Sequence, residues 1–362
     1  MSGPLVIVMG AFPPPVMGLA VANEAMLHAL EDEGAQTLRL DTAPRGPTFL
    51  PRALRVLAAR LPVLGRMAVL ALTCRKAAVY CGLSHGSGQA FDLAALLLAR
   101  LRGFPVTLHH HGYLYLDRPS ALARLLFRVL GRTSRHIVLS EAMAAQLRHV
   151  YPDAANIRVL SNAALIDITR RTEAPDAPLR TLGFLGHVSC EKGADRFVDL
   201  LDLLRGRGLA LDALVAGSIA DDAAARKVKD AEARGVLRYL GPVSGDGKVR
   251  FFGAADVLVL PSRYPNEAEP LVLHEAMAAA LPVIASARGC IPSLVMPGTG
   301  CLLDRDAADL APAVEMIEHW VRDPGAFRSA RAAALAHEIS LAAIGQAALD
   351  SVLAEILSDA RA

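Results

Sequence analysis

Short apolar runs alternate with amphipathic segments along most of the chain. A run at residues 5–12 leads through a proline-rich loop into an amphipathic segment at 19–34, and a second apolar run follows at 37–40. The same order begins again at 182–186. Buried strands that alternate with helices are typical of parallel α/β sheets. The pattern therefore predicts an α/β fold with one sheet in each half of the chain.

Further elements follow from the same pattern, and glycine, proline or polar turns bound most of them. Strands are expected at 78–80, 105–108, 137–139, 158–160, 211–216, 236–240, 257–260 and 283–285. Helices are expected at 91–101, 141–148, 194–204, 246–252, 271–280 and 307–321. The polar stretch 166–178 predicts a linker between an N-terminal domain at 1–165 and a C-terminal domain at 179–340.

The most informative stretch spans residues 261–286 and reads PSRYPNEAEPLVLHEAMAAALPVIAS. It follows the strand expected at 257–260. Pro270 marks the start of a helix, because proline lacks the amide hydrogen that the first helical turn leaves unpaired. The first amides of this helix would point beyond the strand ends, with the positive end of the helix dipole behind them. A phosphate is the expected guest of such a site.

Two carboxylates, Glu267 and Glu275, accompany this helix start, with seven residues between them. One lies in the loop and the other in the second helical turn, so they can reach opposite ends of one ligand. A nucleotide sugar suits both features, with amides for the diphosphate and carboxylates for the hydroxyls of ribose and sugar. The alternative is a solvated acidic loop followed by a surface helix.

The order Glu, seven residues, Glu, followed by Ala-Met-Ala and Pro-Val-Ile-Ala, resembles the signature of retaining glycosyltransferase family 4. The resemblance is close from residue 182 to about residue 304 and loose in the first half. It implies the GT-B fold, in which two doubly wound Rossmann-like domains face each other across a cleft. The nucleotide sugar would bind the C-terminal domain and the acceptor the N-terminal one. It also implies that the last helix, 340–362, packs back on the first domain.

The resemblance assigns the diphosphate site to the second half. Residues 186–193 are similar to the family motif Gly-Arg-x-x-x-x-Lys-Gly, and Lys192 matches the lysine that holds the donor diphosphate. His187 stands where the family has arginine. The electrostatic clamp is therefore either weaker or completed by another cation such as Arg263. A cation at this place would stabilise the charge that builds on the leaving diphosphate.

The remaining donor contacts follow from the same resemblance. The backbone around Pro270, Leu271 and Val272 would hold the diphosphate, Glu275 would hold the ribose hydroxyls, and Glu267 would face the sugar. The family needs no metal and no cofactor for this chemistry. Ser293 replaces a glutamate of the family pattern, so no catalytic role is expected there. The Asp-Arg-Asp at 304–306 is interpreted as a turn that caps the next helix rather than as a metal motif.

Two positions in the first half resemble family sites. Gly18 would let the backbone approach donor phosphate and acceptor, although simple turn chemistry explains the loop equally well. His111, with His110 as the alternative, would lie beneath the donor sugar at a strand end. The three histidines at 109–111 suggest metal, but consecutive strand residues point to opposite faces and do not easily share one ion. Packing at a strand end remains the other interpretation.

Composition and charge indicate the cellular compartment and the kind of partner to expect. Five cysteines are scattered without a C-x-x-C pair, which fits a reducing cytosol rather than disulfides or a zinc knuckle. The first residues lack the features of a signal peptide, and no long uncharged apolar run predicts a spanning helix.

The two halves of the chain differ in charge. Residues 1–173 carry 19 basic and 11 acidic residues, whereas residues 174–362 carry 19 basic and 25 acidic residues. The basic half suggests an anionic partner, and the lack of aromatics and motifs argues against nucleic acid.

The segment 51–80 combines high apolar content with six basic and no acidic residues. This composition is typical of a basic helix on an anionic membrane surface. The alternative is a core helix with snorkelling arginines. Pro62 and Gly65 are expected to divide it into two helices.

Together these features lead us to expect a glycosyltransferase that moves a sugar from a nucleotide diphosphate sugar to an acceptor hydroxyl with retention. The basic segment suggests a lipid-linked glycan acceptor in bacterial surface polysaccharide assembly. It also suggests a cytoplasmic location, peripheral on the inner face of the plasma membrane. Two alternatives remain: a nucleotide-sugar epimerase on the same fold, and a non-catalytic membrane-associated scaffold.

Overall fold

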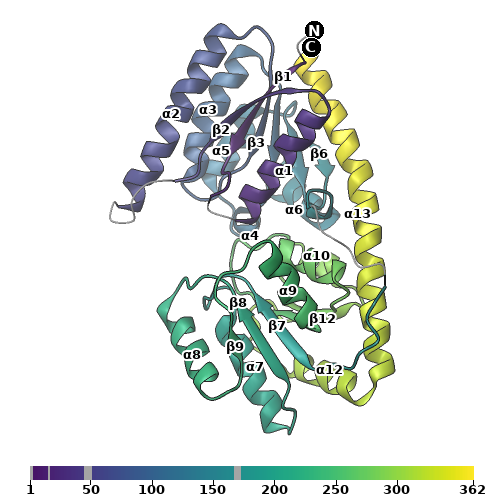
Figure 1. The fold of residues 1–362 in the computed structure, drawn as a ribbon. Helices are drawn as coiled ribbons and strands as arrows, with labels where there is room; N and C mark the ends of the chain where they lie inside the picture. The colour runs from purple at the N-terminus through teal and green to yellow at the C-terminus, as the bar shows by residue number, and fades with distance from the viewer. Residues whose placement is uncertain (1–2, 15–16, 45–50, 167–172) are drawn as a thin grey trace. The chain divides into compact units, whose positions relative to one another are not determined.

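The computed structural model describes residues 3–14, 17–44, 51–166 and 173–362. The chain divides into two compact units (Figure 1). Unit 1 consists of Met1–Ile166 and Ala343–Ala362, and unit 2 of Asp167–Ala342. The division falls inside the segment that the sequence identifies as a linker.

Unit 1 contains a parallel six-stranded sheet in the order β2-β1-β3-β4-β5-β6. Its strands are β1 Leu5–Gly10, β2 Gln36–Asp41, β3 Ala78–Gly82, β4 Val106–His109, β5 Arg135–Val138 and β6 Asn156–Val159. Its helices are α1 Gly18–Asp32, α2 Arg52–Thr73, α3 Gly88–Arg102, α4 Leu114–Asp117, α5 Ala121–Leu130 and α6 Glu141–Val150. The strand order reverses between β1 and β3, so loops diverge at their carboxyl ends.

Unit 2 contains a second parallel six-stranded sheet in the order β12-β11-β10-β7-β8-β9. Its strands are β7 Thr181–Leu185, β8 Asp212–Ala216, β9 Arg238–Tyr239, β10 Val257–Leu260, β11 Val283–Ser286 and β12 Gly300–Leu303. Its helices are α7 Ala194–Gly206, α8 Asp222–Ala233, α9 Asp246–Ala254, α10 Leu271–Ala278, α11 Ile291–Leu294, α12 Ala311–Arg322 and the first half of α13 Pro324–Arg361. The order reverses between β7 and β10, which pair at Val257↔Leu182. Open α/β sheets bind ligands outside such a switch point.

The predicted α/β class with two doubly wound domains is confirmed by these two sheets. The inner strands are short buried runs, as in the all-buried pattern of β10, whereas the edge strands β2, β6, β9 and β12 are only partly buried. Strands covered on both faces by helices need side chains that are apolar throughout rather than alternating. How the two units face each other stays a prediction.

Helix α13 belongs to both units. Its last turns pack Val352, Leu353 and Ile356 against α1 and the β1–β3 part of the sheet in unit 1. Arg135 on β5 donates hydrogen bonds to Glu355 at 2.6 Å and to Asp359 at 2.8 Å. The C-terminal segment is therefore part of the core of unit 1.

Three local predictions were wrong. Helix α2 is continuous from Arg52 to Thr73 with Pro62 inside it. Pro62 lies on the exposed side, where water can pair the carbonyl group that proline leaves without an amide partner. Helix α12 begins at Ala311 rather than at 307, because Asp304 accepts the amides of three following residues and holds a turn there. The helix α8 was not predicted.

Among the residues that the structure describes, two helices are long and apolar enough to cross a bilayer, judged by length and composition alone: Ala53–Thr73 within α2, and α13. The sequence predicts no spanning helix, because it has no long uncharged apolar run. Core helices of soluble proteins can pass the same criterion, and α13 packs into the core of unit 1. In α2 only 11% of the apolar window is buried.

Glycine at position 193 is required by a close approach. Gly193 has a φ of 84°, and a Cβ there would lie 2.0 Å from the carbonyl oxygen of Pro261. Gly208 has a similar φ of 81° but open space around it. We expect Gly208→Ala to cost about 1–2 kcal/mol, the usual penalty of a left-handed alanine. Gly193→Ala should cost at least ~2 kcal/mol more, because two loops must separate.

Urea unfolding of the two variants measures this difference directly. Because both glycines share the same backbone conformation, the excess loss in Gly193→Ala isolates the close approach. Equal losses would show that the loops do not depend on it.

Candidate functional site

Two loops meet at the switch point of unit 2. The loop after β7 spans 186–193, and the loop after β10 spans 261–270. Arg263 donates its backbone amide to Glu191 O at 2.7 Å, and the Ser262 hydroxyl oxygen lies 3.4 Å from the same carbonyl oxygen. Because β7 and β10 are neighbours, residues about 70 positions apart in sequence are brought together.

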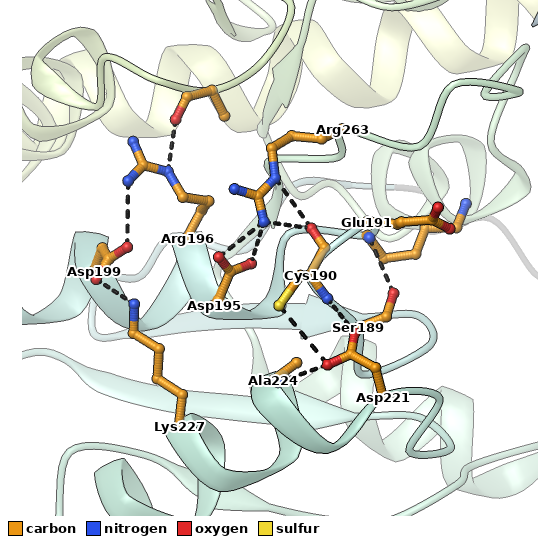
Figure 2. Close-up of polar contacts among 12 residues, drawn as sticks. Ser189, Cys190, Glu191, Asp195, Arg196, Asp199, Asp221, Ala224, Lys227 and Arg263 are labelled. Atoms are coloured by element: carbon orange, nitrogen blue, oxygen red, sulfur yellow. Dashed lines mark hydrogen bonds and ion pairs between the residues drawn. The ribbon is translucent and has the colours of Figure 1, made fainter.

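Arg263 braces these loops. Its Nη2 contacts both carboxylate oxygens of Asp195 at 2.8 Å and donates to Cys190 O at 2.6 Å (Figure 2). Asp221 holds the same loop from the other side, since it accepts the Cys190 amide at 2.6 Å and caps α8 through Ala224 (Figure 2). The guanidinium is thus engaged with Asp195, and a role as the missing donor clamp would require this pair to break.

Lys192 and Glu267 form the central ion pair of the site. Lys192 Nζ lies 2.9 and 2.8 Å from the two carboxylate oxygens of Glu267. Ser262 donates its hydroxyl to the same carboxylate at 2.6 Å, and the ammonium lies 4.9 Å from the ring centroid of Tyr264. The Glu267 side chain is nearly buried at 7% exposure, whereas that of Lys192 is 23% exposed. The cation can therefore be reached from solvent while its carboxylate partner is held.

A second pair joins Lys248 on α9 to Glu275 on α10. Sequence analysis predicted Glu275 but missed Lys248. One signal was present: Lys248 lies in the first turn of α9, where a cation opposes the helix dipole. Such a position becomes favourable when an anion lies nearby.

The start of α10 lies between these pairs. Pro270 is the residue that precedes the helix rather than its first residue, and it has an extended backbone. Within the described residues, the first backbone bond of this turn runs from Leu273 N to Pro270 O. The amides of Leu271 and Val272 come before it, and both residues are half-buried. They are placed to receive an anion, as the sequence predicted, but the structure does not test this role.

His187 adds no strong charge to the site. It is exposed, and its Nδ1 lies 2.8 Å from the Ser218 hydroxyl. Partial burial and the charge of Lys192 both lower its pKa. The imidazole is thus mostly neutral at pH 7, so it can form hydrogen bonds but does not replace the family arginine as a cation.

A buried triad behind the site was not predicted. His274 on α10 lies 2.8 Å from Glu338 on α13 and 3.7 Å from Glu269 in the loop. All three side chains are 0–1% exposed. Burial by itself lowers the pKa of His274, but the two carboxylates, Glu269 nearby and Glu338 in a hydrogen bond, outweigh it and raise the pKa to about 10. The charged imidazolium fastens the start of α10 to α13.

Unit 1 contains the other predicted residues. Gly18 is exposed at the first position of α1. His110 is fully buried and bonds to Tyr115 and, at 3.0 Å, to His136, so it is unsuited to contact a ligand. The ring of His111 packs against that of His109, with the centroids 3.9 Å apart and the planes tilted by 43°. Which of His110 and His111 would contact a ligand stays a prediction.

The electronic state of His111 follows from its surroundings. Burial lowers its pKa to about 3, so the ring is neutral. Its Nε2 is buried and has no hydrogen-bond partner among the described residues. Within the same part of the chain, no cluster of three metal-ligating side chains is found.

A hollow of about 560 Å³ lies in unit 1 beside the ends of β1 and β2. Arg39, Asp41 and Arg66 contribute its charged groups, and Pro13 and Pro62 line it as well. Arg66 and Pro62 belong to α2, so this helix forms one wall. The hollow carries two cations and one carboxylate.

Two family models match the chain. The model described as "Glycosyl transferases group 1" matches residues 179–318, and the "Glycosyl transferase 4-like domain" matches residues 15–163. Together they span most of both units. The chain combines a glycosyl transferase 4-like domain with a domain of the group 1 glycosyl transferases. The predicted family resemblance is thereby confirmed.

Curated relatives agree over shorter segments. The D-inositol 3-phosphate glycosyltransferase of Pseudarthrobacter chlorophenolicus is 34% identical over 155 residues, which cover 41% of this chain and 36% of the relative. That of Mycolicibacterium gilvum is 38% identical over 92 residues, or 25% of this chain and 20% of the relative. The matched segments thus span about a third or less of these relatives.

Solved structures share the fold. Anabaena Alr3699/HepE in complex with UDP has a TM-score of 0.73 at 16% identity, with 96% of this chain and 99% of that chain covered. Sucrose-phosphate synthase from Thermosynechococcus elongatus has a TM-score of 0.72 at 18% identity, with 98% and 99% covered. The GT-B fold of this group 1 glycosyl transferase is thereby confirmed.

The His274 triad should make stability depend on pH. Because the folded-state pKa is raised to about 10, the stabilisation is complete below the ordinary pKa near 6.5 and is lost as pH rises through 10. We expect the difference in free energy of unfolding between wild type and His274→Gln to shrink steadily from pH 6 to pH 10. His28→Gln, on the exposed side of α1, is the control.

Urea titrations across this pH range measure the difference. A gap between wild type and His274→Gln that stays constant or grows with pH would contradict a charged His274.

Proposed function

We propose that the chain transfers a sugar from a nucleotide diphosphate sugar to an acceptor hydroxyl. The observation that carries the proposal is the pair of lysine–glutamate contacts, Lys192–Glu267 and Lys248–Glu275, on either side of the start of α10. Two cations, two carboxylates and the first amides of a helix lie at one switch point. A diphosphate flanked by hydroxyl-bearing groups has the matching chemistry.

The ion pairs suggest how the donor would be accepted. Each lysine is neutralised by a carboxylate in the structure, so a diphosphate would take over a cation and release the carboxylate toward a hydroxyl. Lys192 and Lys248 would hold the diphosphate together with the amides of Leu271 and Val272. Glu275 would turn to the ribose, and Glu267 to the sugar. Charge on the departing diphosphate would be stabilised by groups that are already in place.

The acceptor would bind unit 1. The hollow with Arg39 and Arg66 lies at the carboxyl ends of β1 and β2, where doubly wound sheets bind ligands. Its two cations suit an acceptor that carries phosphate, such as a lipid-linked glycan in assembly of a bacterial surface polysaccharide. Neutral His111 would offer a hydrogen bond to a sugar hydroxyl rather than a charge. Retention of configuration is carried by the family resemblance alone.

UDP is the first nucleoside diphosphate to test, because the structure of Alr3699/HepE was solved in complex with UDP. The curated relatives are named for D-inositol 3-phosphate, which is a phosphorylated polyol. The name of the relatives supports a search for acceptors that carry a phosphate.

The direct test is thermal unfolding with UDP, GDP, ADP, TDP or CDP. A ligand that binds only the folded state adds about 2.7 kcal/mol of stability at a hundredfold excess over its dissociation constant. We expect one diphosphate to raise the melting temperature of the wild type. Lys192→Met and Lys248→Met should each weaken its binding about tenfold or more, because each removes a charge-assisted contact.

Lys229→Met is the matched control, since Lys229 is exposed on α8 in the same unit. It should leave the shift unchanged. If no diphosphate stabilises the wild type, the chain is a scaffold that keeps the fold. If the sugar nucleotide is converted without an acceptor, the chain is an epimerase.

A further inference from the structure

The solvent-facing side of α2 is apolar, which is the reverse of an ordinary surface helix. Leu54, Leu57, Leu61, Val69 and Leu72 are 52, 39, 55, 58 and 86% exposed. They recur every three or four residues, with exposed Gly65 filling the gap between Leu61 and Val69. We call these five side chains the apolar stripe. It runs along a helix of 22 residues.

The opposite side of α2 holds the helix to unit 1. Met67 is fully buried and Val63 is 7% exposed. Arg60 points inward, where it donates to Gly88 O at 2.7 Å and to the Ser84 hydroxyl at 3.1 Å and lies 3.8 Å from buried Asp92. Arg60 is therefore not one of the membrane-facing cations expected from the sequence. Because α2 is fixed along its length, it presents the stripe as a rigid surface.

Neighbouring helices extend this surface. Helices α2 and α3 are in contact, as are α3 and α5, and they lie together in unit 1 (Figure 1). Leu97 and Leu101 on α3 are 39 and 76% exposed, and Leu125 on α5 is 49% exposed. Arg102 donates hydrogen bonds to the backbone just after α2, which ties the end of α3 to the end of α2.

The charge on these helices has one sign. Between residues 42 and 140 the sequence has fourteen basic residues and two acidic ones, Asp92 and Asp117. Asp92 is buried beside Arg60, so it does not contribute to the surface. Exposed arginines accompany the leucines, among them Arg66 on α2, Arg100 and Arg102 on α3, and Arg124 on α5. A polyanion such as RNA would pair with the arginines but leave the apolar stripe in water, whereas an anionic bilayer interface satisfies both.

We propose that the apolar stripe of α2, with the exposed leucines and arginines of α3 and α5, docks unit 1 on a bilayer that contains anionic lipids. Helix α2 lies along the membrane surface, since its inner side stays packed on unit 1. The apolar stripe enters the headgroup region, and the arginines contact lipid phosphates. This surface is separate from the donor site, and its test is binding rather than sugar transfer, so it can fail independently of the proposed function.

The test is flotation of the full-length protein with vesicles of phosphatidylcholine, with or without roughly one-third phosphatidylglycerol. Wild type should float with the anionic vesicles at low salt and much less at high salt. The combined variant Leu61→Gln, Val69→Gln and Leu72→Gln should bind roughly a hundredfold more weakly, because three exposed apolar side chains are replaced.

The matched control replaces three exposed apolar residues elsewhere, Leu203→Gln, Ile339→Gln and Ile344→Gln. It should bind as the wild type does. Unchanged melting temperatures will show that both variants fold. A second variant, Arg100→Gln and Arg124→Gln, should weaken the preference for anionic lipid.

Several outcomes overturn the proposal. Wild type that does not float, or variants of the stripe and of the control that float equally, would show that this surface does not dock. Resistance to alkaline extraction would show a spanning helix instead. A stripe variant that changes only the oligomeric state would show that the surface contacts a second copy of the chain.

Discussion

The approach of two backbone loops at the switch point of unit 2 is the constraint on which the candidate site depends. Gly193 lies so close to Pro261 that any side chain would collide with its carbonyl. Asp195 and Cys190 O then hold Arg263, and this contact keeps the two loops together. With the arginine engaged, the half-buried Lys192 and Lys248 are the cations to which a ligand could bind. A lysine is a compact point charge on a flexible stem, so it can change partners where a paired guanidinium could not.

The charges of the site are arranged so that each lysine could exchange its carboxylate partner for a phosphate. Each lysine already has a carboxylate neighbour, so the structure avoids a cluster of unpaired cations. A polyanionic ligand would replace one negative partner with another, and the desolvation that buried charge requires would already be partly in place. The imidazolium of His274 belongs to a deeper layer. It fixes the helix start from behind and has no route to solvent.

Local features of the fold were predictable because they depend on residues close in sequence. The buried strands and most helices follow from apolar periodicity, and the strand–loop–helix order around Pro270 placed Glu267 and Glu275. What the sequence missed depends on distant partners. Glu338 meets His274 from 64 positions away, and Asp195 holds Arg263 from 68. No local pattern reveals such pairs. The continuity of α2 through Pro62 was missed for another reason, since it depends on which side of the helix faces water.

Helix α13 has a consequence for how the chain is made. The core of unit 1 includes Leu349, Val352 and Ile356, which follow all of unit 2 in the sequence. All of unit 2 lies between them and the first 166 residues. Unit 1 therefore emerges first but completes its core last, whereas unit 2 can close as soon as its own residues are available. Until α13 is synthesised, α1 and part of β3 in unit 1 lack the apolar side chains that cover them in the folded protein. Its core is completed only after unit 2 has been synthesised.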